Sequence, residues 1–165
     1  MPIYNFQQRF WPFIQDGSKQ HTIRTIRRHP CKIGDTMYLY GGLRQPGAKR
    51  LIEPPLCTAK NTIFIMPSGV VIMLNKTLTK NEAMDRFKDS NPFFFLELKI
   101  LTTEQKDALA WYDGFRNEDN PHITAMPGSW KLMFKAWQKL HPLPFAGHID
   151  IWHPYPETLQ YINHT

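Results

Sequence analysis

Fourteen prolines scattered through 165 residues limit what this chain can fold into. Proline fixes its own φ angle, removes a backbone donor and disfavours the helical conformation in the residue before it. The sequence therefore predicts short elements joined by many turns. Because no repeat, low-complexity tract or glycine–serine linker divides the chain, we expect one domain over residues 1–153 and a surface tail over 154–165.

The composition is that of a folded protein. With 42% apolar and 13% aromatic residues, the chain carries more hydrophobic side chains than disordered proteins do. It has no apolar run long enough to cross a membrane, and its start, MPIYNFQQRF, lacks the pattern of a secretory signal. Cys31 and Cys57 are too few for a disulfide framework and are expected to be reduced and buried. We therefore expect a cytoplasmic protein with no membrane partner.

Six segments are predicted as strands, because they are rich in β-branched and aromatic residues or alternate in polarity. They are residues 21–26, 36–42, 61–66, 70–74, 93–101 and 147–152. The third and fourth flank a proline–glycine turn and give the strongest hairpin pattern of the chain. The fifth, FFFLELKIL, is largely apolar and is expected to be buried. In the last, His148 and Asp150 should share one face.

Two capping patterns predict helices. Thr79 with Glu82 opens one that runs to about residue 89, and Thr102 with Gln105 opens another that ends at Gly114. Because these helices are inserted between strands in an order that does not follow βαβ units, the predicted fold class is α+β with a mixed or closed sheet.

Apolar periodicity predicts two further helices. One covers residues 6–16, where Phe6, Phe10 and Phe13 recur at helical spacing. Ser129 is expected to cap the other. Its core-facing stripe consists of Trp130, Met133, Phe134, Trp137 and Leu140.

The positive charge is concentrated in the first third of the chain. The net charge is +6, and residues 1–60 hold ten Lys and Arg against three acids, whereas the remainder holds ten against eleven. This asymmetry favours an anionic partner such as RNA or a nucleotide, although a solvated basic surface has the same composition. The candidate contacts are Arg27, Arg28, Arg44, Lys49 and Arg50, the last three on a predicted loop over 42–50, with Tyr40 as a candidate for stacking on a base.

The stretch GSKQHTIR, residues 17–24, places reactive groups together. If Lys19 lies in a turn and a strand begins near His21, then Thr22 and Arg24 share one strand face and Lys19 can fold back over it. A partly desolvated lysine beside an arginine has a lowered pKa and can act as a base. The guanidinium can hold a phosphate or carboxylate. A polar strand edge with Arg24 paired to an acid is the alternative.

Asp113 is a second candidate, in ALAWYDGF. It falls at the end of a predicted helix, where negative charge opposes the helix dipole. Either it pairs with Lys19 or Arg24, or it forms a local hydrogen bond in the turn.

Together these motifs resemble the ASCH (activating-signal-cointegrator homology) domain of the PUA-like superfamily. The resemblance rests on GxKxxTIR, the following KIGD, the later AxxDGF and the closing LPFAGHIDIW, which occur in the family's order over most of the chain. It implies a small mixed β-barrel with peripheral helices and a charged cleft for RNA or nucleotides. Members with a similar motif include amidohydrolases of N4-acetylcytidine, ribonucleases and non-catalytic binding modules.

The resemblance also implies residue roles. The amidohydrolases use a lysine, a threonine and a glutamate. The first two match Lys19 and Thr22, and the motif's arginine matches Arg24. The glutamate position aligns with Asp113, a departure that shortens the side chain by one methylene group. Lys19, Thr22 and Asp113 are therefore the candidate catalytic residues, and Arg24 is a candidate binding residue.

Other site chemistries lack their motifs. Seven histidines are present, but neither HExxH nor CxxC spacing occurs, so no metal is expected. The phosphate-binding patterns GxxxxGK[ST] and GxGxxG are also missing, so no nucleotide cofactor is expected. The sequence leaves the oligomeric state open.

Overall fold

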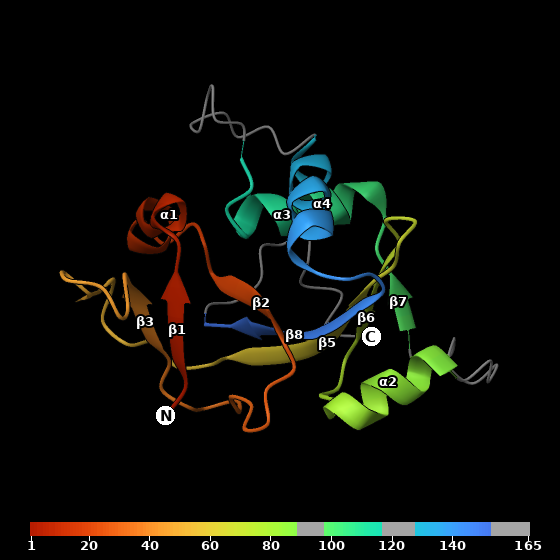
Figure 1. Cartoon of the computed structure of the whole chain (residues 1–165), viewed down its shortest axis with the longest axis horizontal. Coiled ribbons are helices and arrows are strands. Elements are labelled where there is room, and N and C mark those ends of the chain that lie inside the picture. Colours follow the sequence, from red (N-terminus) through yellow and green to blue (C-terminus); the bar gives the residue numbers. More distant parts are fainter. Residues whose placement is uncertain (89–97, 117–127, 153–165) are drawn as a thin grey trace.

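The computed structural model describes residues 1–88, 98–116 and 128–152, so the predicted tail lies outside it. Within these ranges the chain has an α+β fold with two sheets (Figure 1). The strands are β1 (Ile3–Phe6), β2 (His21–Thr25), β3 (Tyr38–Gly41), β4 (Lys49–Arg50), β5 (Ala59–Ile65), β6 (Val71–Leu74), β7 (Leu98–Ile100) and β8 (Phe145–Ile151). The helices are α1 (Trp11–Gln15), α2 (Lys80–Lys88), α3 (Thr103–Tyr112) and α4 (Ser129–Leu140), with a 3-10 turn η1 (Gln8–Phe10) before α1.

The larger sheet has five antiparallel strands in the order β2-β8-β5-β6-β7. It contains the predicted hairpin as β5 and β6, and the predicted strands at 21–26 and 147–152 as β2 and β8. In its register Thr22 lies opposite Asp150 and Ile23 opposite Ile149. Strand β2 forms one edge of this sheet, and that position determines what the strand can offer to a ligand.

The smaller sheet corrects two predictions. Strand β1 runs parallel to β3, and β4 pairs with β3 on its other side. Residues 3–6 are thus a strand with alternating exposure, and the predicted helix over 6–16 is limited to η1 and α1. Pro12 explains the late start, because proline is tolerated only in the first turn of a helix. The predicted loop over 42–50 is also shorter, since Lys49 and Arg50 form β4.

The fifth predicted strand is only partly confirmed. Leu98–Ile100 form β7, and residues 93–97 of the predicted segment lie outside the described ranges. Strand β7 is at an edge of the sheet and Ile100 is 57% exposed, so the prediction that this strand is buried is wrong there. A run of apolar letters does not distinguish a central strand from an edge strand.

The predicted N-terminal cap is confirmed for α3 and wrong for α4. At α3 the predicted capping box is confirmed, with Thr102 and Gln105 bonding each other's backbone N–H groups. At α4 the prediction that Ser129 is the cap is wrong. Gly128 occupies the cap position, and the carboxylate of Asp107, from α3, accepts from the N–H of Trp130 at 2.9 Å. This tertiary cap joins α3 to α4.

Helices α3 and α4 lie together on one side of the five-stranded sheet, as Figure 1 shows. The main core lies between them and the sheet and includes Ile63, Leu109, Met133, Trp137 and Ile149. The predicted stripe of α4 is confirmed for Trp130, Met133 and Trp137, but Leu140 is exposed. A second core forms around the smaller sheet and includes Tyr4, Phe6, Leu39, Cys57 and Trp152.

The structure does not contain the predicted closed barrel within the described residues. The two sheets share no strand, and β1 pairs with β3 instead of with β2. Closure requires every strand to have two neighbours. Strand β2 has only β8, so the five-stranded sheet stays open on that side.

Candidate functional site

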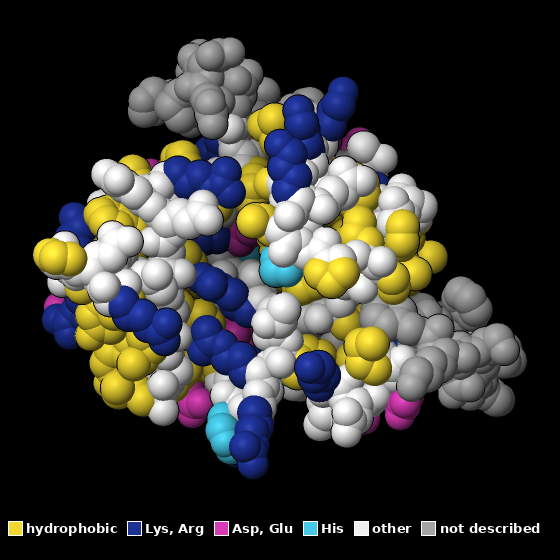
Figure 2. All heavy atoms as spheres, in the orientation of Figure 1, with side chains coloured by type: hydrophobic (Ala, Val, Ile, Leu, Met, Phe, Trp, Pro, Cys, Tyr) yellow, Lys and Arg dark blue, Asp and Glu magenta, His cyan; other side chains and the backbone are white. Residues whose placement is uncertain are grey.

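A pocket of about 250 Å³ lies along the unpaired edge of β2, and we refer to it as the β2-edge pocket. Its lining comes from β1 and η1 (Asn5, Phe6, Gln7, Arg9, Phe10), the β2 region (Lys19, Thr22, Ile23, Arg24, Thr25), the end of α3 (Asp113, Phe115) and the end of α4 (Trp137, Leu140, His141). Figure 2 shows a hollow on this face, bordered by Lys and Arg side chains and with acidic and histidine atoms inside it. All four candidates from the resemblance line this pocket.

Lys19 and Asp113 form a buried ion pair, although 94 positions separate them in the chain. Lys19 Nζ lies 2.6 Å from Asp113 Oδ1 and donates a second hydrogen bond to the Asp113 carbonyl oxygen at 2.7 Å. Both side chains are at least 94% buried, with exposures of 3% and 6%. The expected contact is therefore present, and the shorter aspartate side chain reaches the lysine directly.

Local turns place both partners. The N–H of Lys19 donates to the carbonyl of Phe13 in α1, which directs the chain inward after the helix. Asp113 is the C-cap of α3, and Gly114 follows with φ of +103°. A Cβ on Gly114 would lie 2.7 Å from the ring of Phe10, so both the backbone conformation and the packing require glycine.

The environment shifts the proton equilibrium of Lys19 toward the neutral amine. Burial lowers the pKa of Lys19, and the guanidinium groups of Arg24 and Arg9 lower it further, while the carboxylate of Asp113 opposes the shift. The pair is also surrounded by rings, with Nζ 5.1 Å from the Phe10 ring centre. A lysine with a lowered pKa is suited to proton transfer.

Thr22 and Arg24 share one strand face, as expected. Arg24 Nε donates to Thr22 Oγ1 at 3.1 Å, and its Nη2 donates to the Asn5 carbonyl at 2.9 Å. The guanidinium also lies 5.1 Å from the Phe6 ring centre. Because Thr22 Oγ1 accepts from a cation, negative charge on that oxygen is stabilised. The alternative of Arg24 paired directly to an acid does not occur among the described residues.

His21 lies beneath the ion pair. Its Nε2 is 3.5 Å from Asp113 Oδ1, and the side chain is 1% exposed. Burial lowers the pKa of His21 to about 4, with Lys19 adding to the shift and Asp113 opposing it. The imidazole is therefore neutral near pH 7, so it packs against the carboxylate of Asp113 without replacing Lys19 as its ion-pair partner.

We expect His21 to make stability depend on pH. Its folded pKa is below its unfolded value, so the unfolded chain binds more protons between about pH 6.5 and 4, and stability falls as the pH falls through that window. The stability lost through His21 approaches roughly 3 kcal/mol at the acid end of this window. Urea unfolding from pH 7 to 4.5 should show a steeper slope for the wild type than for His21→Gln. The exposed-site control His29→Gln should keep the wild-type slope, and equal slopes for all three would contradict the assignment.

Sequence reasoning missed several pocket residues. Arg9 lies over the rings of Phe10 and Phe115, at 4.5 and 5.0 Å from their centres. His141 follows α4, and burial together with Arg24 lowers its pKa. No local pattern marks these residues, because tertiary packing of η1 and α4 against β2 brings them to the pocket.

The remaining predicted contacts lie outside the β2-edge pocket. Arg27 and Arg28 line a separate hollow of about 430 Å³ beside the start of α2, and Arg27 also donates to the Ile3 carbonyl. The others are on β3, β4 and the turn between them: Tyr40, Arg44, Lys49 and Arg50. Lys49 covers the ring of Trp11, and Arg50 pairs with Glu53. The structure therefore divides the predicted basic residues among three places.

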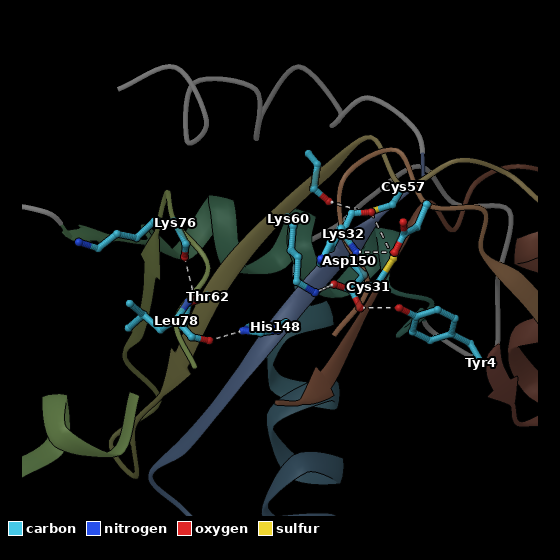
Figure 3. A network of polar contacts seen from close by, with 12 residues as sticks. Tyr4, Cys31, Lys32, Cys57, Lys60, Thr62, Lys76, Leu78, His148 and Asp150 are labelled. Atoms are coloured by element: carbon cyan, nitrogen blue, oxygen red, sulfur yellow. Dashed lines mark hydrogen bonds and ion pairs between the residues drawn. The ribbon is translucent and has the colours of Figure 1, made fainter. Parts of the chain in front are cut away.

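A second buried polar cluster links the two sheets (Figure 3). Asp150 on β8 accepts from the hydroxyl of Tyr4 at 2.7 Å and forms an ion pair with Lys60 on β5. Burial and the neighbouring carboxylate raise the pKa of Tyr4. Cys31 and Cys57 lie beside this cluster as buried free thiols, as expected. The predicted shared face of His148 and Asp150 is confirmed, and both side chains are buried.

Comparison of the chain with protein-family models, with curated proteins and with solved structures finds no match. Within the described ranges, no group of three or more His, Cys, Asp or Glu side chains is arranged to hold a metal ion. Nor does any helix in those ranges combine the length and apolar character needed to cross a membrane.

Proposed function

We propose that this chain is an ASCH-like protein of the PUA-like superfamily whose β2-edge pocket binds a modified nucleoside, free or within RNA, and hydrolyses the amide of an N4-acylated cytidine. The observation that carries the proposal is the Lys19–Asp113 ion pair, since it joins the two distant motifs at a pocket bordered by positive charge. The pocket is small enough to favour a single base over a larger group.

The four residues supply the groups that amide hydrolysis needs. A water molecule, or Thr22 Oγ1, attacks the acyl carbon, and the bond from that carbon to the cytidine nitrogen then breaks. Lys19, in its deprotonated form, takes the proton of the attacking hydroxyl and delivers it to the departing nitrogen. Arg24 donates to the oxygen that becomes negative in the tetrahedral intermediate. The products are cytidine and a carboxylate, and if Thr22 is the nucleophile, water hydrolyses the acyl-threonine in a second step.

Asp113 has a positioning role in this scheme. Lys19 Nζ donates two hydrogen bonds to Asp113, to Oδ1 and to the carbonyl oxygen. Its remaining position, the lone pair of the neutral amine or the third N–H of the ammonium, can then face the pocket. The carboxylate also stabilises the ammonium that forms when Lys19 takes up a proton. The amine is thus held in one orientation during both proton transfers.

A non-catalytic RNA-binding module is the second candidate. It is favoured by the Lys and Arg side chains that border the hollow and by a neighbouring basic hollow lined by Arg27, Arg28 and Lys80. Such a module would bind RNA through its phosphates, with affinity that falls as salt concentration rises. A ribonuclease would use the same Lys19 and Arg24 on a phosphodiester.

Turnover distinguishes these candidates. The wild type is mixed with N4-acetylcytidine, and the absorbance of the base and the release of acetate are followed. We expect conversion to cytidine that is lost in Lys19→Ala. Salt-sensitive RNA binding without turnover would support the binding module instead, and cleavage of RNA would support the ribonuclease.

A further inference from the structure

Within the described residues, the backbone groups of β2 alternate between pointing at β8 and pointing away from the sheet. The N–H of Trp152 donates to the carbonyl of Gln20 at 3.0 Å, which makes this a hydrogen-bonded pair of the β2–β8 ladder. Bonded and non-bonded pairs alternate along antiparallel strands. In the observed register, Thr22 and Arg24 therefore point their backbone groups at β8, while Ile23 between them points its N–H and C=O away from the sheet.

These outward groups of Ile23 lie in the β2-edge pocket. Ile23 lines this pocket while its side chain belongs to the main core, so its outward main-chain groups face the open edge of β2 beside the pocket. The other lining residues come from both faces of β2. Asn5 bonds Arg24 on one face, and Trp137 belongs to the same core as Ile23 on the other. A pocket lined from both faces of an edge strand lies along its open edge.

We propose that the N–H and C=O of Ile23 form the specificity-determining contact of this pocket and read the pairing edge of a cytosine. This inference rests on the proposed function and adds the recognition of the base to it. The N–H donates to ring nitrogen N3, and the C=O accepts from the N–H on N4. A donor and an acceptor that face a pocket favour a ligand that satisfies both over one that satisfies neither.

The pocket favours a small ligand over the other usual partner of a free sheet edge. An added peptide strand needs several consecutive residues to pair. Here the lining also includes Lys19, Asp113 and His141, and the pocket volume is about 250 Å³. The space suits one planar ring with a donor and an acceptor side by side, which is what a cytosine presents at N4 and N3.

A proline at position 23 tests the N–H alone. Because that N–H points away from β8, Ile23→Pro removes the proposed donor and keeps the ladder bonds of Thr22 and Arg24. Ile23→Val is the matched control, since valine has as many side-chain carbons as proline and keeps the N–H. With both variants shown to be folded by circular dichroism, we expect Ile23→Pro to bind cytidine at least about tenfold more weakly than Ile23→Val in calorimetry.

Ligand variants test the carbonyl in the wild type and need no change in the protein. N4-methylcytidine keeps one N–H on N4, whereas N4,N4-dimethylcytidine has none, and both are uncharged at that position. We expect the dimethyl compound to bind at least about tenfold more weakly than the monomethyl compound. This arm decides the question if Ile23→Pro does not fold.

The outcomes separate the two proposals. If the wild type hydrolyses N4-acetylcytidine but binds both methylated nucleosides equally, or if folded Ile23→Pro matches Ile23→Val, the Ile23 contact is wrong and the proposed function stands. If the wild type neither binds cytidine nor hydrolyses its acetylated form, the proposed function fails and this contact fails with it.

Discussion

Lys19→Met is expected to lower kcat/KM toward N4-acetylcytidine by about 10³-fold, within the range that a general base contributes. Methionine keeps the length and apolar stem of lysine but has no group that accepts a proton. The loss should appear mainly in kcat, because Lys19 acts on the attacking hydroxyl and the leaving nitrogen, whereas the cytosine ring is held by other groups in the pocket. Initial rates over a range of substrate concentrations measure both constants.

Removing the amine also changes stability, so a second variant is needed. In Lys19→Met the carboxylate of Asp113, which is 6% exposed, loses its cation. Breaking a buried pair on one side costs up to about 3–5 kcal/mol, less where water in a pocket can reach the remaining charge. The double variant Lys19→Met with Asp113→Asn removes both charges and should regain most of the lost stability without regaining activity.

Lys49→Met is the control for charge. Lys49 is an exposed lysine on β4, outside the β2-edge pocket, and its ammonium covers the Trp11 ring at 4.9 Å. This variant should keep the wild-type kcat/KM within about threefold. A double variant that recovers activity together with stability would show that Lys19 acts only as a structural partner of Asp113.

The sequence predicted the site better than it predicted the surroundings of the site. The motif around Lys19 has strand periodicity, which places Thr22 and Arg24 on one face from local geometry alone. Asp113 stood out because a carboxylate at a helix C-terminus is unfavourable without a partner. Both predictions rest on rules that operate over a few residues, and both contacts are present.

Predictions that depended on long-range packing were less successful. The pairing of β1 with β3 is decided by the whole fold, so the helix predicted at 6–16 is confirmed only over η1 and α1, and the described residues form no closed barrel. Ser129 was chosen as a cap on local grounds, whereas Asp107 on another helix supplies the carboxylate. The basic residues of 42–50 carry the same charge as those of the motif, but they lie on β4 and the turn before it. Charge alone does not predict where a residue lies in the fold.

Asp150→Ala is expected to cost about 3–5 kcal/mol of the free energy of unfolding. Asp150 is 3% exposed and connects three strands from both sheets. Its removal leaves the ammonium of Lys60 buried without its counter-ion and the hydroxyl of Tyr4 without its acceptor. Urea denaturation at pH 7 measures the change.

Two matched variants show why the charge at this position matters more than the hydrogen bond. Tyr4→Phe removes only the bond from the hydroxyl and should cost about 1 kcal/mol. Glu53→Ala breaks the ion pair with Arg50, in which the glutamate is 91% exposed, and should leave the unfolding midpoint unchanged. If Asp150→Ala were no more damaging than Glu53→Ala, the buried pair between Asp150 on β8 and Lys60 on β5 would not stabilise the five-stranded sheet. A large loss confined to Asp150→Ala would show that the buried ammonium of Lys60 needs this carboxylate as its counter-ion, and a smaller loss in Tyr4→Phe would measure the hydrogen bond that joins β8 to the smaller sheet.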